Sequence, residues 1–241
     1  MKINHIRVSN FKNIAEADLD FSPKVNCFLG NNGMGKSNLL DSIYYMSFCK
    51  SFSGMTDTML IKRDEEFSMI DATYSRRGVE EHLQFGITRG HRKSLKRGGK
   101  PYQRLSQHIG AFPLVLSSPH DIDLIRGTGE ERRRWLDMII SQADAVYLDE
   151  LIRYNRCLEQ RNKLLRDHVA DPSLYIALEI QMDRAAEYIT SCRERYVGEI
   201  AGIFNRYYAD IAGEGESVTL AYHRGADVPE MPLLELLERN R

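Results

Sequence analysis

Alternating apolar and polar positions open the chain. The stretches INHIRVSNF (3–11) and AEADLDF (15–21) place apolar residues at every second position, as half-buried strands do. They predict a pair of neighbouring strands. The run KVNCFL (24–29) is almost continuously apolar and predicts a strand buried on both faces.

The apolar spacing then changes from that of a strand to that of a helix. The apolar positions that follow residue 38 recur three to four residues apart, which predicts a helix directly after a glycine-rich stretch at 30–38. That stretch therefore lies on a strand-to-helix turn. The apolar positions of the predicted helix are Leu39, Leu40, Ile43, Tyr44 and Phe48.

Strand patterns return between residues 67 and 116. FSMIDATYS (67–75) and EHLQFGIT (81–88) alternate again and predict antiparallel sheet, followed by a glycine-containing basic segment that ends near Gln103. AFPLVL (111–116) predicts another buried strand, which runs into the turn SSPHD (117–121).

Helical periodicity dominates after about residue 125. Thr128 and Glu131 form a capping-box pattern at the start of EERRRWLDMII (130–140), and the helical spacing continues with breaks to about Tyr208. ESVTLAYH (216–223) has a strand pattern again.

These patterns predict an α/β lobe and a mainly helical second lobe. We expect the first lobe at 1–125, the helical lobe at 126–212, and a segment at 213–241 that returns toward the first lobe. The last stretch, LLELLERNR (233–241), is helical and has no cap or glycine stop signal. We therefore expect the natural sequence to continue beyond Arg241.

Composition narrows the class of protein. With 241 residues and 42% hydrophobic content, the chain can bury a sizeable core, and its net charge of -1 confines any nucleic-acid surface to a local patch. The four cysteines show neither disulfide nor zinc spacing, which predicts a reducing, cytoplasmic location. No apolar run approaches the roughly 20 residues that span a bilayer, so we expect no membrane partner.

The glycine-rich stretch FLGNNGMGKSN (28–38) matches the phosphate-binding pattern G-x-x-x-x-G-K-[ST]. Glycines let successive N–H groups curl around a phosphate at the positive end of the following helix. Lys36 would reach the β- and γ-phosphates, and the Ser37 hydroxyl would complete a Mg²⁺ shell. The predicted nucleotide-binding residues are Gly30, Asn31, Asn32, Gly33, Met34, Gly35, Lys36, Ser37 and Asn38.

A P-loop enzyme also needs an acidic residue at the end of a second apolar strand. The best candidate is AVYLDE (145–150), but its flanking leucines and isoleucine have helical spacing. We therefore predict a helix there and assign no catalytic residue.

Seven basic residues and no acid lie between positions 89 and 104. Such a segment could neutralise DNA phosphates without reading sequence, or it could be a solvated hairpin, and the pattern does not decide between the two. The candidate DNA contacts are Arg92, Lys93, Lys96 and Arg97.

Four segments resemble one known family in order and spacing. They are INHIRVSNFKNI, NCFLGNNGMGKSNLLDSIYYMS, LSSPHDIDLIRGTGEERRRWLD and YLDELIRYNRCLEQRNKLL. The chain resembles the RecF family of bacterial recombination mediators, whose head is similar to SMC-type and ABC-type ATPases. The resemblance implies a P-loop NTPase lobe of that kind, with a mixed sheet, beside the helical lobe.

The resemblance also implies a function. It implies a protein that binds ATP and Mg²⁺, recognises DNA at gapped or single-strand/double-strand junctions, and helps to load RecA with RecO and RecR during DNA repair, replication restart and the SOS response. ATP drives homodimerisation in the full-length family. Lys12 and Asn13 match the family's motif near the nucleotide, and Ser118, Pro119 and Asp121 match the turn that approaches the γ-phosphate.

This chain departs from the family in two places. The family's signature motif and catalytic carboxylate belong downstream of Arg241, so we expect the 241 residues to bind ATP without efficient hydrolysis or a closed dimer. SFSGMTDTMLI (51–61) also lacks the family's arginine after Ser-Phe. Two alternatives stay open: a P-loop kinase or other phosphotransferase, and another SMC-like structural ATPase, although sustained heptads are missing.

Overall fold

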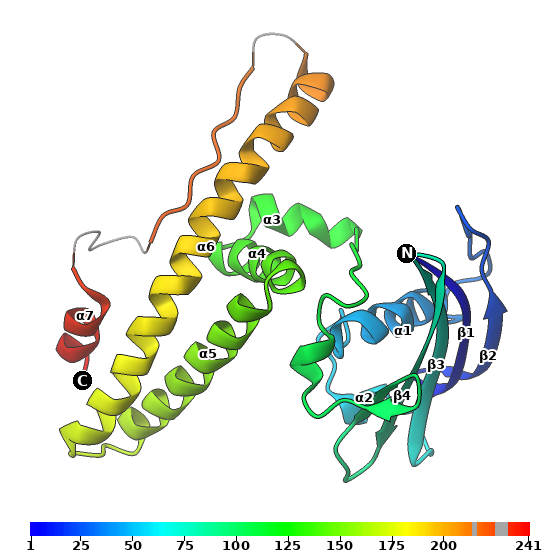
Figure 1. Cartoon of the computed structure of the whole chain (residues 1–241), viewed down its shortest axis with the longest axis horizontal. Coiled ribbons are helices and arrows are strands. Elements are labelled where there is room, and N and C mark those ends of the chain that lie inside the picture. Colours follow the sequence, from blue (N-terminus) through cyan, green and yellow to red (C-terminus); the bar gives the residue numbers. More distant parts are fainter. Residues whose placement is uncertain (214–215, 225–230) are drawn as a thin grey trace. The chain divides into compact units, whose positions relative to one another are not determined.

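The computed structural model describes residues 1–213, 216–224 and 231–241. The chain forms two compact units, Met1–Ser118 and Pro119–Arg241. Figure 1 shows the first unit as a sheet with one long helix and the second as a set of helices.

The first unit is built on a six-stranded sheet with the order β2-β1-β3-β4-β5-β6. Every described pair of neighbouring strands is antiparallel, and the predicted pairing of the first two strands is confirmed. The basic segment forms the last two strands, a hairpin. The strands are β1 (Lys2–Phe11), β2 (Ile14–Asp20), β3 (Phe67–Arg76), β4 (Val79–Thr88), β5 (Ser94–Arg97) and β6 (Lys100–Pro101).

One face of this sheet packs against helix α1 (Lys36–Phe48), which follows the glycine-rich turn as predicted (Figure 1). Period-2 alternation buries every second residue of the central strands, so their apolar side chains face α1. The Tyr45 ring of α1 is fully buried and meets the Phe85 ring of β4 edge-on, with centroids 4.6 Å apart. The short helix α2 (Asp57–Leu60) adds the buried Leu60 to the same core.

Two predicted strands are wrong. Residues 24–29 and 111–116 form no strand, and Val25, Leu29 and Val115 are strongly exposed. A strand requires a neighbour to satisfy its backbone N–H and C=O groups, and no described strand pairs with either segment. The apolar run alone carried no information about such a neighbour.

The second unit is mainly helical within its described ranges. The expected helix at 130–140 and the reading of AVYLDE as helix are both confirmed, whereas 216–224 contain no strand, contrary to the pattern at 216–223. The helices are α3 (Asp123–Arg126), α4 (Gly129–Ala143), α5 (Ala145–Arg166), α6 (Pro172–Ala212) and α7 (Leu233–Arg239), with a 3₁₀ turn at Pro119–Ile122.

Side-chain caps explain where the three long helices of this unit begin. The Thr128 hydroxyl accepts from the Glu130 N–H of α4 at 3.2 Å. Asp144 and Asp171 cap α5 and α6 in the same way, with N–H to oxygen distances of 3.0 and 2.9 Å. Each cap satisfies a helix N–H group that has no partner inside the helix.

The second core lies among α4, α5 and α6. Leu136, Ile140 and Tyr147 pack there against Ala185, Ile189 and Cys192. A buried ion pair, Arg161 with Glu179, joins α5 to α6 at an N–O distance of 2.9 Å.

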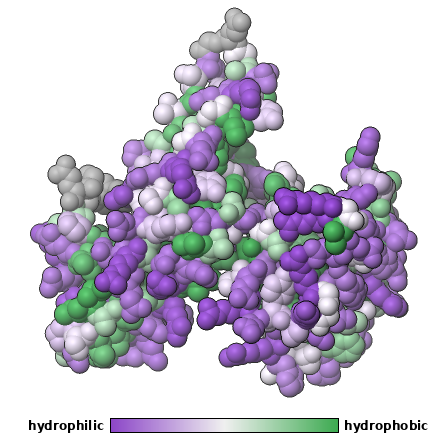
Figure 2. Space-filling view, in the orientation of Figure 1, coloured by the Kyte–Doolittle hydropathy of each residue, from purple (hydrophilic) through white to green (hydrophobic). Residues whose placement is uncertain are grey.

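The surface is mainly hydrophilic on the face shown, with separate hydrophobic patches (Figure 2). No helix within the described ranges combines the length and the apolar character that crossing a bilayer would require. The four cysteines are all free thiols. Cys27 is exposed and the other three are buried.

Candidate nucleotide-binding site

The glycine-rich loop adopts backbone angles that only glycine adopts readily. Gly30, Gly33 and Gly35 have φ values of 152°, 82° and 93°. Gly35 is also the N-cap of α1, and a Cβ atom there would lie 2.8 Å from Asn13 Oδ1. Gly35 is therefore required both for its conformation and for the close approach of Asn13.

The loop ends at the N-terminus of α1, where the first N–H groups of a helix have no partner within it. The first turn of α1 carries no acidic side chain, so no carboxylate competes for that positive end. A Cβ atom at Gly30 or Gly33 would meet nothing within 4 Å, so the space beside the loop at these two positions is open. This arrangement can hold a phosphate group.

Lys36 and Ser37 lie in the first turn of α1. The Lys36 ammonium donates to the carbonyls of Gly30 and Asn31, both at 2.8 Å, so it is held across the mouth of the loop. The Ser37 side chain is exposed on the same turn. A cation and a hydroxyl at this place suit a polyphosphate and its magnesium ion.

Asn13 connects the β1–β2 turn to the loop. Its Nδ2 donates to Gly33 O at 2.7 Å, and its Oδ1 accepts from Asn38 Nδ2 at 2.7 Å. One side chain therefore fixes both the middle of the loop and the first turn of α1. The structure thus brings Asn13 to the phosphate-binding turn.

Lys12 points to the flank of α1 instead of the loop. Its Nζ lies 2.6 Å from Asp41 Oδ2, and the side chains of Lys12 and Asp41 are 9% and 0% exposed. Asp41 also accepts from Ser51 Oγ at 2.6 Å and from Phe52 N at 2.8 Å. Sequence reasoning missed Asp41, because the only signal was a polar residue on the buried face of an amphipathic helix.

A groove of about 630 Å³ adjoins the loop and shares Asn13 and Asn38 with it. Met55, Met59 and Ile61 form an apolar side of the groove, and its other lining residues are polar. No sequence pattern predicts this groove, because its walls come from segments far apart in the chain. Its other lining residues are Lys12, Ser53, Thr58, Arg63 and Arg89.

The basic segment divides into engaged and exposed residues. Lys93 forms an ion pair with Asp57, and Arg97 forms one with Glu81, which lowers the pKa of Glu81 from its ordinary value. Arg92 and Lys96 are exposed, and their side chains make no hydrogen bond or ion pair within the described chain. The four residues therefore do not form one free cationic surface.

The other predicted site residues lie where the second unit begins. Pro119 and Asp121 belong to the 3₁₀ turn, and Ser118 directly precedes it. Their approach to a γ-phosphate stays a prediction. Within the described residues, no group of three or more His, Cys, Asp or Glu side chains could hold a metal ion.

Comparisons with known proteins agree with this geometry. The family model "AAA ATPase domain" matches residues 1–98. The chain is 47% identical to the DNA replication and repair protein RecF of Parabacteroides distasonis over 222 residues, covering 92% of this chain and 61% of the relative. It is 45% identical to RecF of Porphyromonas gingivalis, covering 100% of this chain and 66% of the relative.

Solved structures of RecF have the same fold. The recombination mediator RecF-ATPrS in the RecFOR pathway superposes with a TM-score of 0.87 at 28% identity, covering 99% of this chain and 66% of that one. The corresponding RecF-ATP structure gives a TM-score of 0.85 at 28% identity, with coverages of 98% and 65%. The expected fold class, a P-loop ATPase lobe with a helical second lobe, is confirmed.

The chain spans 61% to 66% of the length of these first curated relatives. The match nevertheless runs through both units and includes the phosphate-binding turn. By sequence and by structure, this chain belongs to the RecF family.

Proposed function

We propose that the protein is an ATP-dependent DNA-binding protein of recombinational repair and replication restart. It binds Mg²⁺-ATP at residues 30–38, recognises gapped or single-strand/double-strand DNA junctions, and helps to load the RecA recombinase. The observation that carries the proposal is the phosphate-binding turn, with open space beside Gly30 and Gly33 and with the Lys36 ammonium hydrogen-bonded to the carbonyls of Gly30 and Asn31. Membership of the RecF family supports the DNA part of the proposal.

The nucleotide fits the loop and the groove together. The phosphates accept hydrogen bonds from the N–H groups at the start of α1. The Lys36 ammonium leaves the carbonyls of Gly30 and Asn31 and donates to phosphate oxygens instead. The base and ribose lie in the adjoining groove, where Met55 and Met59 provide apolar contact. Asn13 stands between the two parts and orients the loop.

The Ser37 hydroxyl fits a magnesium ion, because Mg²⁺ prefers oxygen ligands and is usually shared among one or two protein groups, phosphates and water. When bound, the ion neutralises phosphate charge. We assign no residue of the described chain to hydrolysis, and weak ATPase activity is an expectation from the family.

DNA and partner proteins complete the proposal. The exposed Arg92 and Lys96 supply phosphate contacts, which give affinity without sequence specificity. The RecF protein in the similar RecF-ATP structure is described as part of the RecFOR pathway, and this supports RecO and RecR as partners. ATP-dependent homodimerisation is proposed for the full-length protein.

The test measures two affinities. Binding of a fluorescent ATP analogue with Mg²⁺ is compared between the unmodified protein and Lys36→Ala, and binding to a gapped duplex is measured with and without ATP. We expect Lys36→Ala to weaken nucleotide binding at least tenfold, since loss of a charge-assisted contact costs about 1.5–3 kcal/mol. If DNA affinity were indifferent both to ATP and to this substitution, the proposal would be wrong.

A further inference from the structure

Lys93 lies at the base of the basic hairpin, which we define as residues 94–101 (β5, β6 and their turn). Its ammonium donates to Cys49 O at 2.6 Å and lies 3.2 and 3.1 Å from the two carboxylate oxygens of Asp57. The same ammonium lies 5.5 Å from the centroid of the Tyr45 ring. These contacts direct Lys93 toward α1, although it is part of a basic segment.

Cys49 is the C-cap of α1, in the left-handed conformation. The last turn of α1 carries no basic residue of its own, and the carbonyls at a helix C-terminus attract a cation. Lys93 supplies that cation from another part of the chain. Asp57 completes the arrangement, because it also accepts from the Tyr45 hydroxyl at 2.7 Å.

The opposite end of α1 is the phosphate-binding turn. The helix has 13 residues, so Lys93 and the loop hold two ends of one rigid rod about 20 Å long. Tyr45 sits in that rod, fully buried against Phe11 and Phe85. A displacement at its C-terminal end therefore cannot be absorbed by loose packing.

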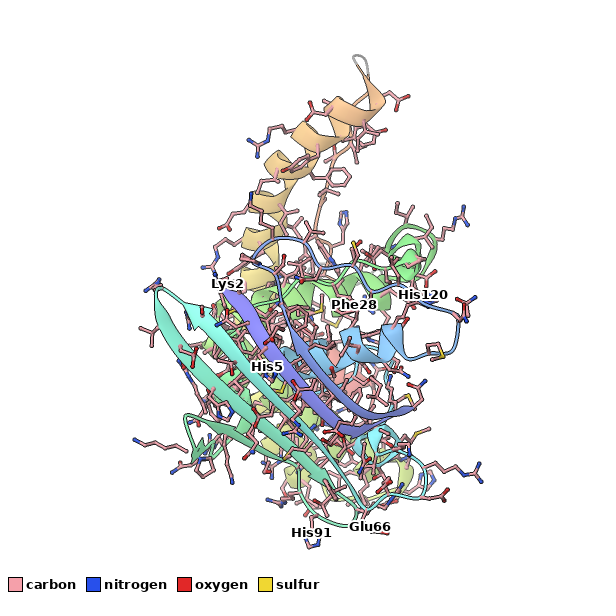
Figure 3. All side chains as sticks on the ribbon, turned by 90° about the vertical axis from the view of Figure 1, so that its right-hand side faces the viewer. Lys2, His5, Phe28, Glu66, His91 and His120 are labelled. Atoms are coloured by element: carbon pink, nitrogen blue, oxygen red, sulfur yellow. The ribbon has the colours of Figure 1, made fainter. Side chains whose placement is uncertain are left out.

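The segment between β4 and β5 also contacts the candidate nucleotide site through Arg89. Arg89 lines the groove next to the loop, and its Nε donates to Glu65 O at 2.9 Å. Its backbone N–H donates to Glu66 O at 3.0 Å, and Figure 3 labels Glu66 and His91 at the same end of the sheet. The residues that lead into the hairpin thus contact both the groove and the end of α1.

A direct contact between Lys93 and DNA fits these observations poorly. Its donors already have acceptors in Cys49 and Asp57, and the side chain is only 24% exposed. Arg92 and Lys96, on either side of it, are exposed. A DNA phosphate would have to break the Lys93 contacts, whereas its neighbours are accessible without rearrangement.

We propose that Lys93 is a positioning residue that joins the basic hairpin to the ATP-binding helix, so that a polyanion on the hairpin and ATP on the loop influence each other's affinity through α1. The inference rests on the proposed function, since it requires both ligands to bind. Because such coupling is reciprocal, either ligand can report it.

The experiment measures the affinity of a non-hydrolysable ATP analogue with Mg²⁺, in the absence and presence of a saturating gapped duplex oligonucleotide. We expect the unmodified protein to show a ratio of the two affinities of about fivefold or more. In Lys93→Met we expect this ratio to fall to one, with the oligonucleotide still bound. Lys93→Arg, which keeps the charge and a donor to Cys49 O, restores the ratio.

Lys96→Met is the matched comparison, because it removes one ammonium from the hairpin, three residues from Lys93, without touching α1. It should weaken oligonucleotide binding and leave the affinity for the analogue without DNA unchanged. If Lys93→Met is poorly folded by thermal melting, Asp57→Asn tests the same link from the other side.

Three results overturn the inference: a ratio of one in the unmodified protein, an unchanged ratio in both Lys93→Met and Asp57→Asn, or a Lys93→Met variant that loses only oligonucleotide affinity, as Lys96→Met does. If the unmodified protein failed to bind the analogue at all, the proposed function itself would fail, and that outcome is distinct from the other three.

Discussion

Asn13 offers a direct test of how the phosphate-binding loop is held. Asn13→Ala removes two hydrogen bonds of 2.7 Å, one to Gly33 O and one from Asn38 Nδ2. Each bond contributes about 1 kcal/mol net, and both lie at exposed positions where water can replace the lost partner. We therefore take about 1–2 kcal/mol as the total, which corresponds to between about fivefold and thirtyfold in an equilibrium constant.

This free energy should appear mainly in nucleotide affinity. Without Asn13, the loop is no longer held in its binding conformation. The free energy needed to order the loop is then subtracted from the binding free energy of the nucleotide. We expect Asn13→Ala to weaken binding of an ATP analogue about tenfold by calorimetric titration, with only a small change in the melting temperature.

Asn13→Asp is the informative companion. It keeps the acceptor for Asn38, loses the donor to Gly33 O, and places a negative charge beside the phosphates, so we expect weaker binding than in Asn13→Ala. The reasoning would be refuted if Asn13→Ala bound nucleotide as tightly as the unmodified protein while Lys36→Ala did not.

The remaining predictions concern charge. Lys12→Met leaves the buried carboxylate of Asp41 without its cation and should cost about 3–5 kcal/mol in urea unfolding, much of which Lys12→Met combined with Asp41→Asn should recover. Arg97 lowers the pKa of Glu81 below its ordinary value of 4.5, so the stabilisation from this pair is present above pH 4.5 and is lost as the pH falls through the lowered pKa. Arg97→Ala should therefore lose more stability at pH 7 than at low pH, where the contact of Arg97 with the Phe112 ring is still lost, as judged by thermal melting across that range. Arg92→Ala should reduce the salt dependence of DNA binding by about one phosphate contact, measured as the slope of log K against log salt concentration.

The sequence identified the phosphate-binding turn because the motif's spacing encodes its backbone geometry. Each glycine with positive φ and the lysine in the first turn of α1 follow from local chemistry. The half-buried strands were predictable for a similar reason, since a period of two records which face is covered.

Features that depend on contacts between distant segments could not be predicted in this way. Asp41 is held by the Lys12 ammonium, the Ser51 hydroxyl and the Phe52 N–H, and the groove draws on residues from 12 to 89. The run at 24–29 has the composition of a buried strand, but the described chain gives it no neighbour. Counting charges likewise could not show that Lys93 and Arg97 are engaged with acids of their own unit.

The distribution of thiols makes the phosphate-binding loop easy to observe. Cys27, three positions before Gly30, is exposed, whereas Cys49, Cys157 and Cys192 are buried. Burial also raises the pKa of the Cys49 thiol to about 12, so it carries almost no reactive thiolate at neutral pH. Within these 241 residues, a maleimide fluorophore would therefore react mainly at Cys27, next to the candidate nucleotide site, and would report loop movement without any engineered cysteine.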